Sequence, residues 1–198
     1  VLQGTSMSYI IFVDSRVENF NLKFLTEDSQ GNKRQVSLDP DKVITLNAGQ
    51  DGLVQMVDAL QGVKDLDAIH IVSDGSPGHL LLGSTNLNSI TFAEHTLNLA
   101  LIGRSLKSDL QLDLTLAKGD ILLYGSNVAL GEVGNNFVQA IANVTRGDVA
   151  ASFNATKGIG ESNWELEFET AARGLGSKDP DGKGYNVNLV DQLIGTSG

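Results

Sequence analysis

Short apolar segments that alternate with amphipathic ones constrain the fold of this chain more than any other feature of its sequence. Such alternation is typical of βαβ units, which build a parallel sheet. The apolar segments are rich in β-branched residues and are expected to be strands buried on both faces. They are residues 9–13, 42–46, 68–73, 120–124 and 148–151. The sequence therefore predicts an α/β fold of three layers, in which helices cover both faces of a mostly parallel, Rossmann-like sheet.

The amphipathic segments predict the helices. Apolar residues recur at helical spacing after Asp51, a suitable N-cap, and again through residues 133–141. Residues 90–106 are helical in pattern as well. Residues 20–40 carry charges around a polar turn and predict a surface hairpin or excursion, while residues 164–168 predict an edge or antiparallel strand.

The length of 198 residues suits one domain with a substantial core. Gly-Thr-Ser occurs near both ends, and Met7 stands where a native start would, so we interpret residues 1–6 and the last few residues as expression-derived. Residues 7–169 are predicted to form the domain. Residues 170–198, which are rich in Gly and Asp and lack periodicity, are predicted to be a tail or linker.

The formal charge of −10, from 14 Lys and Arg against 24 Asp and Glu, argues against nucleic acid and anionic lipid as partners. No apolar run approaches the roughly 18 residues of a membrane-spanning helix, so no membrane insertion is expected. The chain has no cysteine, which excludes disulfides, thiolate metal ligands and a cysteine nucleophile.

Ligands and catalytic groups of open α/β sheets gather at the carboxyl ends of the strands. The residues that follow the predicted strands include Asp14, Asp74, Ser126 and Ser152. Glycine accompanies two of these ends, in Asp74-Gly75 and in Gly125-Ser126-Asn127, and lets the backbone turn sharply or approach a ligand closely. The same residues are also compatible with ordinary turns between strand and loop.

Four segments in collinear order resemble a bacterial family that is known only as a domain of unknown function. They are residues 68–78, 120–129, 148–152 and 163–167, and the opening Ile10-Ile11-Phe12-Val13-Asp14-Ser15 fits the family too. The resemblance covers roughly residues 9–169. It implies a secreted or cell-surface location near the N-terminus of a very large bacterial protein rich in adhesin, cadherin-like or calcium-binding repeats.

The strand-end motifs of that family read Ser-His-Gly and Tyr-Gly-Cys, and they resemble the dyad of the caspase, legumain and gingipain clan of cysteine peptidases. The resemblance implies a caspase-like fold, with Asp74 in the position of the base and Ser126 in that of the nucleophile. The two are 52 residues apart (126 − 74), against about 50 in caspase signatures. The backbone N–H groups of Gly75 and Ser126 would then be the oxyanion donors.

Both reactive positions depart from the family pattern, which implies an inactive site. A cysteine attacks as its thiolate, whereas a serine hydroxyl needs an adjacent base. A carboxylate is a weak base, because its ordinary pKa is about 3.9. We therefore expect no peptidase activity, no cofactor and no metal, and a recognition or structural role toward a protein or peptide. The alternative is an inactivated form of a cysteine endopeptidase, possibly self-cleaving, whose His and Cys have been replaced.

A receiver-like phosphoacceptor domain is a second alternative. Asp74 would be the acceptor, Asp14 would help to bind Mg²⁺, and Ser126 and Lys157 would take the two remaining conserved positions. Receivers usually carry paired acids after the first strand, however, and here Ser15 and Arg16 follow Asp14. A nucleotide-binding Rossmann domain is disfavoured, because no G-x-G-x-x-G follows the first strand.

The remaining site predictions concern the surroundings of the dyad positions. Asp14, His79, Gly125, Asn127 and Ser152 are expected to line the same cleft, and His79 is close enough in sequence to Asp74 to serve as a replacement base. His70 lies within a predicted strand and is expected to be a buried histidine of the sheet. The oligomeric state is left open by the sequence.

Overall fold

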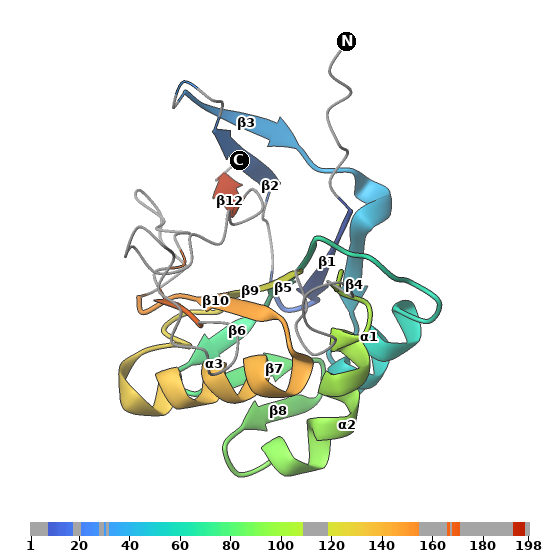
Figure 1. Cartoon of the computed structure of the whole chain (residues 1–198), viewed down its shortest axis with the longest axis vertical. Helices are drawn as coiled ribbons and strands as arrows, with labels where there is room; N and C mark the ends of the chain where they lie inside the picture. Colours follow the sequence, from blue (N-terminus) through green and yellow to red (C-terminus); the bar gives the residue numbers. More distant parts are fainter. Residues whose placement is uncertain are drawn as a thin grey trace.

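A six-stranded sheet forms the centre of the molecule (Figure 1). The computed structural model describes residues 8–17, 21–27, 30, 32–108, 119–154, 166, 168–170 and 192–196. The strands of the sheet, in spatial order, are β11 (Phe168–Glu169), β10 (Asp148–Ala151), β9 (Asp120–Tyr124), β5 (Ala68–Val72), β1 (Tyr9–Asp14) and β4 (Val43–Leu46). All neighbours are parallel except β11, which runs antiparallel to β10 at the edge. The predicted mostly parallel α/β sheet is confirmed.

The five parallel strands follow the order 2-1-3-4-5 when they are numbered along the chain. The order reverses between β1 and β5, which are direct neighbours. In sheets of this kind ligands bind outside the carboxyl ends of the strands, beside the point of reversal. The topology therefore directs attention to the ends of β1 and β5, and to β9 beside them.

Three helices connect these strands within the described residues: α1 (Gly52–Ala59), α2 (Phe92–Gly103) and α3 (Gly131–Thr145). A short 3₁₀ turn, Pro40–Lys42, precedes β4. Asp51 caps α1 as predicted, because its carboxylate accepts the Val54 N–H at 3.0 Å. Helix α3 ends at Arg146, which adopts a left-handed conformation with φ of 65°.

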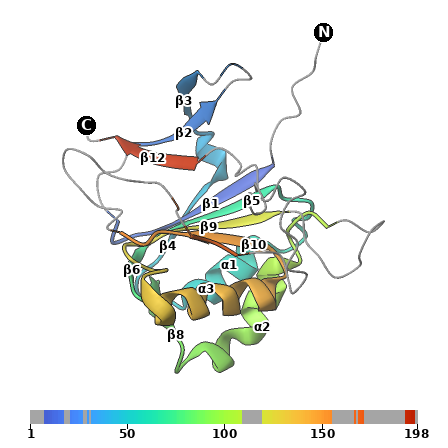
Figure 2. The same cartoon turned by 60° about the vertical axis from the view of Figure 1, so that its left-hand side comes forward.

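The described helices all lie on one face of the sheet, rather than on both as the sequence predicts (Figure 2). Leu53 and Met56 of α1, Ile102 of α2 and Val138 of α3 share one apolar core with alternate strand residues. The residues of the other sheet face form a second cluster, to which non-helical segments contribute Val17, Leu38 and Leu166. Strands that are buried on both faces must be packed against other segments on each side. On this second face those segments are loops rather than helices.

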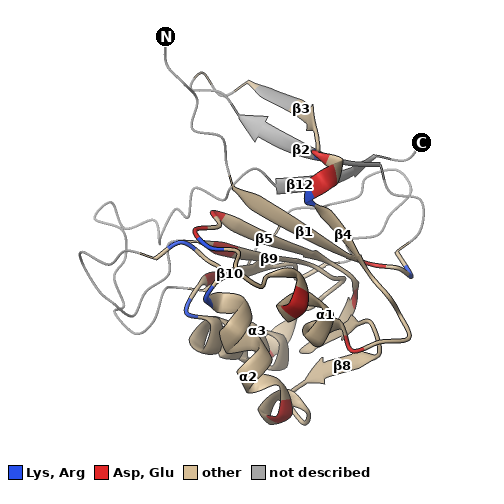
Figure 3. Ribbon diagram, turned by 90° about the vertical axis from the view of Figure 1, so that its right-hand side faces the viewer, with Lys and Arg blue, Asp and Glu red and all other residues tan. Residues whose placement is uncertain are grey.

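A second, antiparallel sheet of three strands lies on the side opposite the helices (Figure 2, Figure 3). It contains β2 (Asn21–Glu27), β3 (Lys33–Ser37) and β12 (Gln192–Thr196), in the order β12-β2-β3. Strands β2 and β3 confirm the predicted hairpin. Within residues 170–198, which the sequence predicts to be a tail or linker, β12 pairs with β2 along five residue pairs. Pairing satisfies backbone groups that an open edge of β2 would leave exposed.

A third sheet follows β5 directly, where the sequence predicts only a loop. Its strands are β6 (Asp74–Ser76), β7 (His79–Leu82) and β8 (Thr85–Asn88), joined as an antiparallel meander. Leu80, Leu82 and Leu87 are buried in the main core, so one face of the meander is apolar. The meander thus anchors the segment that contains Asp74 to the body of the domain.

Some sequence predictions lie outside the described residues, namely those for residues 1–6, for Lys157 and for most of residues 164–168. The described end of that last segment, Phe168, belongs to the antiparallel edge strand β11. No helix in the described part of the chain combines the length and apolar character needed to span a membrane.

Candidate functional site

The segments that carry Asp74 and Ser126 meet at the carboxyl edge of the sheet. Val72 and Tyr124 are aligned partners in the parallel pair β5 and β9, and Asp74 and Ser126 each follow two residues later. The backbones of the two segments approach closely at Gly75 and Gly125, because a Cβ placed on Gly75 would lie 3.1 Å from the Gly125 Cα. Both Asp74 and Ser126 are half-buried. The two predicted dyad positions therefore belong to neighbouring, touching segments.

Glycine is required at this contact because of crowding beneath it. A Cβ on Gly75 would lie 2.6 Å from Cγ2 of Val128, and a Cβ on Gly125 would lie 2.7 Å from the same atom. Val128 is fully buried, so it cannot move out of the way without disturbing the core. The two glycines thus allow the loops to approach each other, and neither is used for a positive φ.

The segment after Ser126 is held against the end of β10. Asn127 has a left-handed backbone with φ of 59°, and its N–H donates to the Asn154 carbonyl at 2.8 Å. The Ala129 N–H donates to the carbonyl of Ser152 at 3.0 Å. Ser152 is fully buried, and its hydroxyl accepts the Asn154 N–H at 3.1 Å. The predicted site residues Asn127 and Ser152 therefore position the loop, and the buried Ser152 is withdrawn from solvent.

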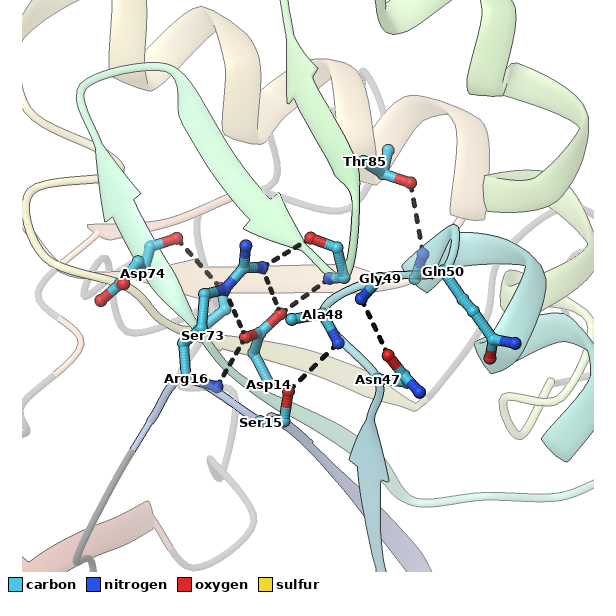
Figure 4. Close-up of polar contacts among 12 residues, drawn as sticks. Asp14, Ser15, Arg16, Asn47, Ala48, Gly49, Gln50, Ser73, Asp74 and Thr85 are labelled. Atoms are coloured by element: carbon cyan, nitrogen blue, oxygen red, sulfur yellow. Dashed lines mark hydrogen bonds and ion pairs between the residues drawn. The ribbon is translucent and has the colours of Figure 1, made fainter.

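Asp14, at the end of β1, forms a clamp with Arg16 and Gly83 (Figure 4). Its Oδ1 accepts the Arg16 backbone N–H at 3.0 Å and Nε–H at 2.8 Å. Its Oδ2 accepts Nη2–H of Arg16 and the Gly83 N–H, both at 2.7 Å. Arg16 Nη2 also donates to the Gly83 carbonyl at 2.6 Å. The clamp thus ties the end of β1 to the turn between β7 and β8.

The clamp accounts for the electrostatics of Asp14. Burial alone acts to raise the pKa of this carboxyl, but the hydrogen bonds from Arg16 and Gly83 outweigh burial and lower it. The Asp14 side chain is 1% exposed. Four N–H donors occupy the lone-pair positions of a carboxylate, so Asp14 has no oxygen left for a ligand. The sequence singled out Asp14 and missed the role of Arg16.

Arg16 links this clamp to the segment of Asp74. The Arg16 side chain is 34% exposed, and its pKa is raised by the hydrogen bond to Asp14 and further by the charges of Asp14 and Asp74. Asp74 lies beside Arg16 in the close-up (Figure 4). A fixed positive charge therefore stands next to the predicted position of the base.

His79 is engaged by its own sheet. Its Nδ1 lies 3.4 Å from the Ser76 Oγ, and its Nε2 lies 3.3 Å from the Asn86 Oδ1. These are the hydrogen-bond partners of His79 within the described residues, and Ser126 is not among them. The structure therefore does not support His79 as a replacement base for Ser126.

His70 is fully buried in β5, as the sequence predicts. Its Nδ1 lies 3.2 Å from the Tyr124 hydroxyl, and the two rings stack with centroids 5.9 Å apart. Burial lowers the pKa of His70 to about 3, so the imidazole is neutral at physiological pH. The neutral His70 imidazole is therefore part of the buried interior and not of the candidate site.

Two acidic residues lie on β10 and β11, at the β11 end of the strand order. Burial raises the pKa of Asp148, the first residue of β10, to about 6. The pKa of Glu169 is raised by burial and by the charge of Asp148. Within the described ranges no three His, Asp or Glu side chains are grouped so that they could hold a metal ion.

The fold and the strand-end residues together define a class, an α/β domain wound in the order 2-1-3-4-5 with its candidate site at the carboxyl edge of the central strands. Within that class the chain belongs to the family described as Domain of unknown function (DUF4347), whose sequence profile matches residues 10–178. The predicted membership in a family of unknown function is thereby confirmed. Comparison with curated proteins gave no significant match, and comparison with solved structures gave none either.

Proposed function

We propose that this chain is a catalytically inactive, caspase- or gingipain-like domain of a large secreted or surface protein of bacteria, with a recognition or structural role toward a protein or peptide. The observation that carries the proposal is the contact between Gly75 and Gly125. Asp74 directly precedes Gly75, and Ser126 directly follows Gly125. The contact therefore brings Asp74 and Ser126 into the same region. These are the two positions that the resemblance to the caspase clan assigns to a base and a nucleophile.

The proposed lack of activity follows from the groups available as a base. A serine hydroxyl attacks only when an adjacent group accepts its proton. His79 is bonded to Ser76 and Asn86, and His70 is buried against Tyr124, so neither imidazole serves Ser126. Asp74, at the position of the base, is a carboxylate, and a carboxylate is a weaker base than an imidazole.

A recognition role is supported by the exposure of the same residues. Asp74 and Ser126 are half-buried, whereas Ser152 and Asp14 at neighbouring strand ends are fully buried. A half-buried carboxylate and hydroxyl can still bind a peptide backbone or a cationic side chain, although they cannot cleave it. The formal charge of −10 favours partners of opposite charge.

The proposal is tested by incubating the wild type with a peptide library and following both the library and the intact chain by mass spectrometry. We expect the wild type and Ser126→Ala to be equally inert. Ser126-dependent cleavage of any peptide, or of the chain itself, would refute the proposal. The double variant Asp74→His with Ser126→Cys, measured beside each single variant, addresses the alternative of an inactivated cysteine endopeptidase. Cleavage by the double variant alone would favour that parent.

The receiver alternative is favoured by one observation, since the order 2-1-3-4-5 is also that of receiver domains. It is opposed by the clamp, because the four N–H groups around Asp14 leave no oxygen for Mg²⁺. We expect no binding of beryllofluoride with Mg²⁺ in isothermal calorimetry. Binding that is lost in Asp74→Asn would favour the receiver.

A further inference from the structure

Ser76, His79 and Asn86 share the outer face of the β6-β7-β8 meander. Ser76 and His79 are direct partners across the hairpin, and Asn86 pairs with Leu81, two residues along β7 from His79. Side chains two residues apart on a strand point to the same face. The other face carries Leu80, Leu82 and Leu87 into the core, so Ser76, His79 and Asn86 face outward. Ser76 itself is exposed.

The contacts of His79 determine which of its ring nitrogens carries the proton. The Asn86 Oδ1 can only accept, so the His79 Nε2, 3.3 Å away, is the donor. A neutral imidazole has one donor and one acceptor nitrogen, which leaves the Nδ1 lone pair directed at the Ser76 hydroxyl at 3.4 Å. The arrangement is a hydroxyl, a base in the right tautomer, and a third group that orients the base.

We propose that Ser76 is a base-assisted nucleophile toward activated acyl esters, with His79 as the base and Asn86 as a positioning residue. A nucleophile in reach of a base that a third group orients is the arrangement that activates serine. Such hydrogen bonds are often long without substrate and tighten when it binds. The site is independent of the function proposed for Asp74 and Ser126.

The reaction is a simple acyl transfer. The Ser76 Oγ attacks the carbonyl carbon of the ester while its proton passes to Nδ1 of His79. The bond from the carbonyl carbon to the leaving oxygen breaks, and with p-nitrophenyl acetate the leaving group departs as p-nitrophenolate. Ser76 then carries the acetyl group, and His79 releases the proton to solvent. Attack by water on the acetyl ester regenerates the hydroxyl and yields acetate and a proton.

The turn that follows Ser76 limits the rate of this reaction. Pro77 has no N–H, and the Gly78 N–H already donates to the Val128 carbonyl at 3.0 Å. The turn therefore offers no donor for the developing oxyanion, and loss of one such donor costs about 10²–10³ in rate in known enzymes. We expect slow acylation that stops at one acetyl group on Ser76 over the time of the measurement.

The test is a time course with p-nitrophenyl acetate, read by peptide mass spectrometry at individual serines. Ser89, exposed just beyond β8, is the internal control for a serine without a base. We expect Ser76 to be acetylated at least about tenfold faster than Ser89, and His79→Gln to reduce Ser76 to the level of Ser89. Asn86→Ala should slow the reaction several-fold, and Asn86→Asp should restore it by supplying an acceptor oxygen.

Two results would overturn the proposal. One is equal acetylation of Ser76 and Ser89 in the wild type. The other is an unchanged rate at Ser76 in His79→Gln, provided that circular dichroism shows the variant to be folded. All of the substituted side chains face outward from the meander, so the variants are expected to fold.

Discussion

Asp14 and Asp74 lie at the carboxyl ends of adjacent strands of one sheet, but they differ in burial. Asp14 is 1% exposed and receives four N–H donors from Arg16 and Gly83. Asp74 is half-buried, next to the contact between Gly75 and Gly125. A saturated, buried carboxylate holds two parts of the fold together, whereas a half-buried one can still meet a ligand. Burial distinguishes these roles when residue type and topological position do not.

Replacement of Asp14 should have the largest effect. Asp14→Ala removes the acceptor for the Gly83 N–H and for Arg16, and loss of one member of a buried pair costs about 3–5 kcal/mol. Because the guanidinium of Arg16 is partly exposed, we expect about 3 kcal/mol in the free energy of unfolding, measured with urea. Asp74→Ala should cost about 1 kcal/mol or less, as half-exposed charges do.

The exposed ion pair between Lys107 and Asp67, with an N–O distance of 3.2 Å, provides the control. Lys107→Ala should cost less than about 1 kcal/mol. If Asp14→Ala cost no more than Lys107→Ala, the clamp would not be the structural element that its geometry indicates.

Acid should destabilise the domain through His70, which lies in β5 below Asp74. The unfolded chain binds a proton at an ordinary histidine pKa of 6.5, while the folded histidine, with its pKa of about 3, stays neutral. The stability that neutral His70 provides is complete above pH ~6.5 and is lost as pH falls, by up to about 1.4 kcal/mol per unit. Between pH 6.5 and 5 we expect a loss of about 2 kcal/mol that is absent in His70→Gln.

An NMR titration checks the same point without a variant. The His70 ring resonance should not shift between pH 7 and about 4. A midpoint near the ordinary histidine value would show that the imidazole is exposed to water, contrary to its burial between strands.

The close approach of the two loops makes a smaller prediction. Gly75→Ala should cost roughly 1–2 kcal/mol, because the new methyl group would overlap Cγ2 of Val128. Gly75→Ala should cost less when it is added to Val128→Ala than when it is added to the wild type, since the clashing methyl group is then missing. Gly75→Ala without any cost would mean that the loops are further apart than described.

The sequence predicted the sheet well and the polar contacts poorly, for different reasons. Strands such as Ala68–Val72 and Asp120–Tyr124 are continuous apolar runs, and their burial on both faces is a local signal. Because the apolar runs also mark where the strands end, the sequence places Asp74 and Ser126 at neighbouring strand ends. The partner of Asp14 was not, because the Gly83 N–H arrives from a turn 69 residues away.

Two elements were missed although weak signals exist. The buried Leu80, Leu82 and Leu87 anchor β7 and β8, but Pro77 before them and two nearby asparagines of β8 indicate turns. Strand β12 lies in a segment rich in Gly and Asp, and only its pairing with β2 orders it as a strand. Pairing between segments so distant in sequence has no local signature.

The central claim is that positions 74 and 126 lie close enough to form one site, and a thiol placed at position 126 tests it most directly. The rate of alkylation by iodoacetamide should be measured against pH for Ser126→Cys, alone and combined with Asp74→His or Asp74→Asn. A neighbouring imidazolium lowers the pKa of a thiol, and a neighbouring carboxylate raises it. We predict that Asp74→His lowers the alkylation midpoint by at least about one pH unit, with Asp74→Asn in between. Identical midpoints in all three variants would contradict the claim.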